Sequence, residues 1–140
     1  MDQDKRIMIE ISPGELWDRL TILDVKLNNI PTDEVVKLDN VNFCYEKTME
    51  TYLSLVKIEA KKTNWVIAKD FYGRLYDINN KLWKVEDKLR EYEREKIFDS
   101  EFIKLARSVY KLNDKRFKLK RKIDKIFGSK LLEEKSYEKY

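Results

Sequence analysis

The fold is decided by residues 71–127, which read FYGRLYDINNKLWKVEDKLREYEREKIFDSEFIKLARSVYKLNDKRFKLKRKIDKIF. Apolar side chains recur along this stretch at alternating steps of three and four residues. Such spacing is typical of long helices that bury one face against a neighbouring helix. Asp99 and Ser100 separate two apolar runs, and either residue can cap the start of a helix. We therefore predict a long helical hairpin formed by residues of about 66–96 and 100–127.

An arginine interrupts the second of the two apolar runs. The first run consists of Ala68, Phe71, Leu75, Ile78, Leu82, Val85, Leu89 and Tyr92, and the second of Phe102, Leu105, Val109, Leu112, Arg116, Leu119, Ile123 and Ile126. A charge at a core-facing position is costly unless it is paired. Arg116 therefore predicts either a bound anion or a carboxylate opposite it. The helical acids available for this role are Asp18, Asp24, Glu86 and Asp87.

The first half of the chain predicts two further helices. Ser12 is followed by proline, and Glu15 stands three residues after Ser12, which is the pattern of a capping box. The apolar stripe that follows ends before Pro31, and Thr32 can cap the next helix. The two stripes are Leu16, Leu20, Leu23, Leu27 and Ile30, and then Leu38, Val41, Tyr45, Met49, Tyr52 and Val56.

The connections between these helices are short. Residues 6–11 alternate partly between polar and apolar side chains and predict a short N-terminal extended segment. Residues 61–64, Lys-Lys-Thr-Asn, are the expected turn before the long hairpin, and Gly128 is the expected left-handed stop at its end. We expect residues 1–140 to form a single all-α domain, an antiparallel bundle of three to four helices.

Composition excludes several classes of function. The 140 residues include 42% hydrophobic and 40% charged side chains with 3 Gly and 2 Pro, a balance that favours long charged helices. Cys44 is the one cysteine and histidine is absent, so catalytic Ser/His or Cys/His pairs are excluded, and we expect no metal and no cofactor. No 18-residue apolar run is present, which predicts no membrane span and a cytoplasmic location. Enzymatic activity stays undecided at this point.

Charge is distributed unevenly along the chain. Residues 1–60 hold 7 Lys/Arg and 12 Asp/Glu, whereas residues 61–140 hold 23 and 14, and residues 104–130 alone hold 11 and 2. Either an acidic first half pairs with a basic last helix, or the basic helix binds a polyanion. Proximity within a bundle favours internal pairing.

A second stripe of polar and aromatic side chains lies beside each apolar run. The stripes are Tyr72, Tyr76, Asn79, Trp83, Glu86 and Arg90, and Ala106, Tyr110, Asn113, Phe117, Lys120 and Asp124. They either widen the buried face, with polar groups that satisfy one another, or line a polar pocket for an anionic or hydroxyl-rich ligand. The candidate ligand-binding residues are Tyr76, Asn79, Trp83, Glu86, Arg90, Arg107, Tyr110, Asn113, Arg116 and Lys120.

A third stripe on the last helix is basic. It consists of Lys104, Arg107, Lys111, Lys115, Lys118, Lys122 and Lys125, at unbroken steps of three and four. Such a track resembles a phosphate-binding surface, but it contains no aromatic side chain on which a base could stack. We therefore interpret the stripe as a solvated face and do not expect nucleic acid as a partner.

Four segments resemble a family of small proteins of unknown function. They are GELWDRLTILDVKL at 14–27, NNKLWKVEDKLREYE at 79–93, FDSEFIKLARSVYKLNDKRFKLKRKID at 98–124 and EEKSY at 133–137. The family occurs in bacteria and some phages, and some members are associated with sugar-transfer and surface-polysaccharide proteins. A looser similarity runs to small helical chorismate mutases, which bind a dicarboxylate, although residues 15–19 here carry a different arginine spacing. The family resemblance implies one helical domain and a role near sugar metabolism.

These observations predict a helical binding or interaction module, accessory to sugar or surface-polysaccharide metabolism. The alternative is a small helical enzyme or binder that acts on an anionic molecule such as a sugar phosphate, a nucleotide sugar or a carboxylate. Nucleic-acid binding through the basic stripe is a second alternative. A homodimer is expected where the long hairpin extends beyond the shorter first helix.

Overall fold

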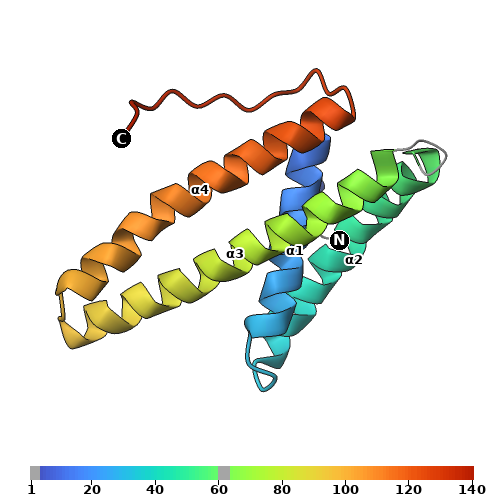
Figure 1. The fold of residues 1–140 in the computed structure, drawn as a ribbon. Helices are drawn as coiled ribbons and strands as arrows, with labels where there is room; N and C mark the ends of the chain where they lie inside the picture. Colours follow the sequence, from blue (N-terminus) through green and yellow to red (C-terminus); the bar gives the residue numbers. More distant parts are fainter. Residues whose placement is uncertain (1–3, 60–63) are drawn as a thin grey trace.

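The computed structural model describes residues 4–59 and 64–140, and its secondary structure is entirely α-helical (Figure 1). The helices are α1 (Pro13–Asn29), α2 (Val35–Glu59), α3 (Asn64–Glu95) and α4 (Ser100–Ile126). The predicted all-α class and the long hairpin are confirmed. Within the described ranges no residue forms a strand, and residues 4–12 lead into α1 without regular secondary structure.

Helix α1 begins as the sequence predicts, but only half of the expected capping box forms. The Glu15 backbone N–H donates to Ser12 Oγ at 3.1 Å, and Pro13 occupies the first helical position. The Glu15 carboxylate does not return to the Ser12 backbone. It contacts Lys120 of α4, with Oε2 and Nζ 2.8 Å apart. A charged partner on another helix competes successfully with the local cap.

The predicted start of the second helix is wrong by two residues. A turn in which Glu34 N–H donates to the Pro31 carbonyl occupies the position where Thr32 was expected to cap, and α2 starts at Val35. The first helical bond of α2 instead joins Leu38 N–H to the Glu34 carbonyl at 3.1 Å. The turn predicted at residues 61–64 lies outside the described residues except for Asn64, where α3 begins.

Helix α1 holds the fold together. It crosses the antiparallel pair α3 and α4 and packs against each of the other three helices, while α2 lies mainly along α1 (Figure 1). The buried cluster at this crossing consists of Leu16, Trp17, Phe71, Leu75, Leu119 and Ile123. Trp17 is fully buried and meets the rings of Tyr52 and Phe127 at centroid distances of 4.8 and 5.2 Å.

The hairpin extends well beyond this core. Near its turn the seam residues are only half-buried, and Ile97, Phe98 and Ile103 are exposed at its tip. Figure 1 shows the tip projecting past α1 and α2. The homodimer expected at this end stays a prediction.

Helix α4 ends at the predicted glycine, and the chain then turns back. Gly128 has φ 65°, its N–H donates to the Lys125 carbonyl, and Ser129 N–H donates to the Asp124 carbonyl at 2.8 Å. These two bonds form a Schellman motif, which satisfies the last carbonyls of the helix. The segment of residues 129–140, called the tail below, then runs back along α4 (Figure 1).

In the described part of the chain, no helix combines the length and the apolar character needed to cross a lipid bilayer.

Candidate binding cleft and its charge network

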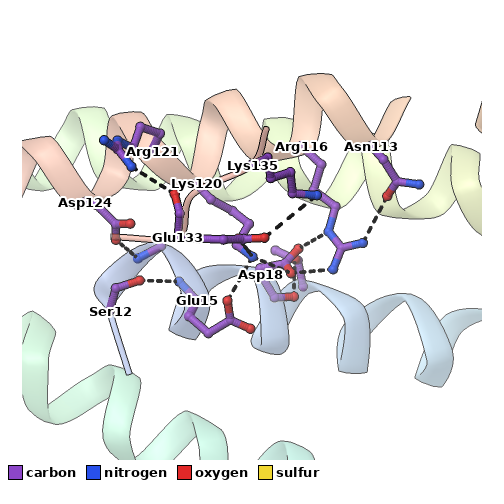
Figure 2. Close-up of polar contacts among 12 residues, drawn as sticks. Ser12, Glu15, Asp18, Asn113, Arg116, Lys120, Arg121, Asp124, Glu133 and Lys135 are labelled. Carbon is purple, nitrogen blue, oxygen red and sulfur yellow. Dashed lines mark hydrogen bonds and ion pairs between the residues drawn. The ribbon is translucent and has the colours of Figure 1, made fainter. Parts of the chain in front are cut away.

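The partner of the core-facing arginine is the first-helix aspartate. Arg116 Nε donates to Asp18 Oδ1 at 2.8 Å and Nη2 donates to Oδ2 at 2.7 Å (Figure 2). Two parallel bonds of this kind match the fork of a guanidinium to the two oxygens of a carboxylate. The Asp18 side chain is 2% exposed and that of Arg116 is 29% exposed. This confirms the prediction that a carboxylate faces Arg116.

Helix α3 contributes polar groups to the same centre. Asn79 Nδ2 donates to Asp18 Oδ1 at 3.1 Å and to Thr21 Oγ1 at 2.9 Å. Thr21 Oγ1 in turn donates to the Asp18 carbonyl. Among the described residues, every fully buried side-chain nitrogen or oxygen has a hydrogen-bond partner. The centre is therefore a satisfied network, in which the buried Asp18 carboxylate is stabilised by neighbours on α3 and α4.

Lys120 joins this centre to the tail. Its Nζ lies 2.8 Å from Glu15 Oε2, 2.8 Å from Glu133 Oε2 and 3.8 Å from Asp18 Oδ2 (Figure 2). Burial opposes the charged form, but the hydrogen bonds that the ammonium donates to Glu133 and Glu15 outweigh it and raise the pKa of Lys120 above its ordinary value. The ammonium therefore stays charged inside a cage of carboxylates.

The tail is bound to α4 at both ends. Near its start, Arg121 Nη1 donates to the Glu133 carbonyl at 2.9 Å, and Nη2 pairs with Glu134 Oε1 at 2.9 Å. The sequence contains a feature that could have predicted the contacts of Arg121 with the tail, because the two acids of the EEKSY segment follow shortly after a basic helix. The predicted pairing of the acidic first half with the basic last helix is made by Asp18 with Arg116 and by Glu15 with Lys120, and the tail adds further carboxylates.

Aromatic contacts continue this attachment toward the C-terminus. The Lys135 ammonium lies over the Phe117 ring at 5.5 Å, and the Tyr140 hydroxyl donates to Asp114 Oδ2 at 2.6 Å. The rings of Tyr110 and Tyr140 meet edge to face at 5.0 Å. The tail therefore covers much of the polar and aromatic stripe of α4, which explains side chains that the helix packing alone does not require.

Each face of α4 now has a distinct environment. The apolar seam packs on α1 and α3. The second stripe contacts the tail, the cleft and the start of α1. The third face is the basic stripe. All seven members of the basic stripe are exposed, and none has a carboxylate within ion-pair distance in the described residues. Internal pairing thus involves Arg116, Lys120 and Arg121 and leaves the outer cations to solvent. The expectation that nucleic acid is not a partner stays a prediction.

Glu133→Gln is expected to loosen the tail at neutral pH. The hydrogen bond from Lys120 holds the pKa of Glu133 below its usual range. A lowered carboxyl pKa means that the contact is fully present above about pH 4.3 and is lost as the pH falls through the lowered value. In wild type, {¹H}–¹⁵N heteronuclear NOE values of residues 131–140 should therefore fall on acidification, and Glu133→Gln should show low values already at pH 7.

Glu134→Gln is the matched control for this prediction. Glu134 is 75% exposed and pairs only with Arg121 among the described residues, so its removal should change the tail little. Equal NOE values in wild type and Glu133→Gln at pH 7 would show that the Lys120 contact does not hold the tail.

A cleft of about 610 Å³ opens beside the Asp18–Arg116 pair. Its walls come from α1, α3 and α4. The lining residues are Ile22, Val25, Asn79, Leu82, Trp83, Glu86, Asp87, Arg90, Asn113 and Arg116. Asn113 accepts from Arg116 Nη1 at 3.3 Å, so the floor of the cleft is held by the same network.

Six of the ten candidate ligand-binding residues line this cleft together. They are Asn79, Trp83, Glu86, Arg90, Asn113 and Arg116. The other four lie elsewhere. The Tyr76 hydroxyl accepts from Asn28 at 3.1 Å beside another hollow, Tyr110 packs against the tail, Lys120 is enclosed by carboxylates, and Arg107 is exposed on α4.

The sequence reasoning missed the contribution of α1 to the cleft. Ile22 and Val25 line it, and Asp18 supports its floor. Asp18 had been one of four acids considered for Arg116, but the periodicity of α1 does not reveal where it crosses the hairpin. Asp87, another of these four acids, also lines the cleft and was not among the candidate ligand-binding residues.

Fold and site define an all-α protein in which a short helix crosses a long hairpin and forms a cleft with apolar and polar walls beside a buried ion pair. The chain belongs to a family of unknown function, DUF6165, whose model matches residues 7–140. No curated protein and no solved structure matches the chain.

Proposed function

We propose that this protein is a binding module whose cleft holds a small, hydroxyl-rich molecule such as a sugar unit. The observation that carries the proposal is the composition of the cleft. The Trp83 side chain lines the cleft together with aliphatic, amide and charged side chains, and the volume of about 610 Å³ is within the range of small-molecule sites. An accessory role in sugar or surface-polysaccharide metabolism would suit such a ligand.

The side chains offer complementary chemistry to a polyol. Indole presents a π-face with negative potential, which favours contact with polarised C–H groups. Asn113 offers both a donor and an acceptor, Glu86 accepts and Arg90 donates. A sugar hydroxyl can therefore find a partner whether it donates or accepts a hydrogen bond. The polar side chains stand on helices rather than loops, and the Asp18–Arg116 pair supports the floor, so the site is preorganised.

The charge of the cleft favours a neutral moiety over a multiply charged anion. Arg116 is already paired with Asp18, and Arg90 lies 3.8 Å from Asp87. Glu86 adds a further negative charge to the wall. Positive charge in this cleft is therefore matched by carboxylates, and an isolated anion would gain little here.

Trp83→Ala is expected to weaken binding of the sugar ligand at least about tenfold, equivalent to about 1.4 kcal/mol. The ligand would first be found by thermal shift with a panel of neutral saccharides, sugar phosphates and nucleotide sugars, because a ligand that binds only the native state raises Tm. Affinities of wild type, Trp83→Ala and Trp83→Phe would then be measured by calorimetry. Trp83→Phe keeps an aromatic face and should retain most of the affinity.

Arg107→Gln is the matched control. Arg107 was also a candidate from the sequence, but it lies outside the cleft, so its replacement should leave affinity unchanged. Arg90→Gln removes an exposed cleft residue with little expected effect on stability and should weaken binding. A panel without any stabilising ligand, or equal losses in Trp83→Ala and Arg107→Gln, would contradict the proposal.

A further inference from the structure

A second hollow adjoins the cleft on the other side of α1. Its volume is about 510 Å³, and it lies between α1, α2 and Arg116 of α4. Ile22 and Arg116 line both hollows, so the two are neighbours separated by no more than these side chains. The character of the second hollow is different, because Arg19 and Lys26 of α1 and Lys47 of α2 line it.

The positive charge of this second hollow is largely uncompensated. Its two acids already have partners, since Asp18 binds Arg116 and Glu15 binds Lys120. In the described residues Arg19 and Lys26 have no ion pair, and Lys47 has only Glu50 at 3.9 Å, with both side chains more than half exposed. Such an exposed pair adds little stability, and Glu50 does not line the second hollow, whereas Asp87 lines the cleft beside Arg90. Three cations therefore face one hollow without a matching carboxylate.

The side-chain chemistry of these cations suits a phosphoryl group. Arg19 and Lys26 are seven residues apart on one helix, about 10 Å along its axis. A guanidinium offers a planar fork of donors and an ammonium offers a compact charge, a combination that phosphate oxygens accept well. A phosphate ester carries close to two negative charges and three acceptor oxygens. Three cations therefore bind it better than they bind a carboxylate, which has one charge and two oxygens.

We infer that the second hollow holds the phosphoryl group of the same ligand whose hydroxyl-rich part occupies the cleft, so that the ligand is a phosphorylated sugar. The inference rests on the proposed function and adds the chemical class of the ligand. The junction at Ile22 and Arg116 is where the two parts of the ligand meet. Arg116 is held by Asp18 through Nε and Nη2 and by Asn113 through Nη1, which leaves one hydrogen on each of Nη1 and Nη2 to donate to the ligand.

The test compares a hexose with its 1-phosphate and with the corresponding hexuronate by calorimetry on the full chain. The phosphate should bind at least about tenfold tighter than the neutral sugar, and its affinity should fall with added salt. The double variant Lys26→Gln/Lys47→Gln should lose this advantage while keeping the affinity for the neutral hexose. Lys111→Gln, in the exposed basic stripe, should behave as wild type.

Each outcome decides between the two proposals. If the neutral hexose binds and Trp83→Ala weakens it, but phosphorylation adds no affinity, the second-hollow inference fails and the proposed function stands. An equal loss of phosphate affinity in Lys111→Gln, or hexuronate binding as tight as that of the phosphate, also overturns the inference. If no member of the hexose series and no member of the wider panel binds, both proposals fail.

Discussion

Asp18→Ala is expected to lower the free energy of unfolding by about 3–5 kcal/mol, because it removes one partner of a buried ion pair and leaves the other charge without compensation. Asp18 is buried and accepts both hydrogen bonds from the Arg116 guanidinium. Its loss also removes an acceptor from Asn79 and a nearby negative charge from Lys120. Urea unfolding followed by circular dichroism would measure the change, with the midpoint and slope read separately.

Asp87→Ala is the control for this experiment. Asp87 is also an aspartate in a pair with arginine, but the pair is exposed and 3.8 Å long, so its removal should cost less than about 1 kcal/mol. A double-mutant cycle with Asp18→Asn and Arg116→Gln would isolate the coupling between the two side chains. A loss below 1 kcal/mol in Asp18→Ala would show that the pair does not stabilise the crossing of α1.

Gly14→Ala is expected to destabilise the protein by about 1–3 kcal/mol. Gly14 is buried where α1 meets α4, and its N–H donates to Asp124 Oδ1 at 2.7 Å. A Cβ at this position would collide with the Lys120 carbonyl oxygen and lie 2.8 Å from Asp124 Oδ1. The backbone carbonyl belongs to a helix and cannot move alone, so α1 has to shift away from α4.

Gly73→Ala tests the same substitution where space is free. Gly73 lies inside α3, and a Cβ there would meet no atom within 4 Å. Alanine should therefore stabilise this helix by about 0.5–1 kcal/mol through its better helix propensity. Thermal unfolding of both variants should show shifts of opposite sign. A stabilising effect of Gly14→Ala would mean that the close approach of α1 to α4 is not required.

Asp18→Ala and Gly14→Ala both test the contact between the start of α1 and α4. The N-terminus of α1 meets α4 at Gly14, where Asp124 places a carboxylate near the positive end of the helix. One helical turn after Gly14, the Asp18 carboxylate accepts hydrogen bonds from Arg116. Close backbone approach and the ion pair together set the position of α1, and this position forms both hollows.

Much of the fold could be predicted because the signals are local. The three and four residue spacing indicated α3 and α4 to within two residues at each end, and Ser12, Asp99 and Gly128 act as the predicted helix boundaries. Asp99 Oδ1 accepts from the Phe102 N–H at 3.0 Å, as a cap does. These features depend on side chains a few residues apart, whose interactions are the same in many folds.

The candidate site could be predicted only in part. The helical stripe correctly placed Asn79, Trp83, Glu86 and Arg90 on one wall of the cleft, because residues three and four apart share a face. The residues of the α4 stripe have different surroundings, since the Tyr110 ring contacts the tail and Lys120 is enclosed by carboxylates of the tail and of α1. The path of a segment without regular structure leaves no periodic signal that could show this.

The sequence by itself determined that this chain forms a long helical hairpin with a charged residue in its seam that requires a partner. Only the tertiary structure decided that the partner is Asp18, 98 residues away, and that the second stripe of α4 serves the tail as well as the cleft. The physical reason is that helix formation follows from nearby residues, whereas the pairing of a buried charge depends on where a distant helix crosses.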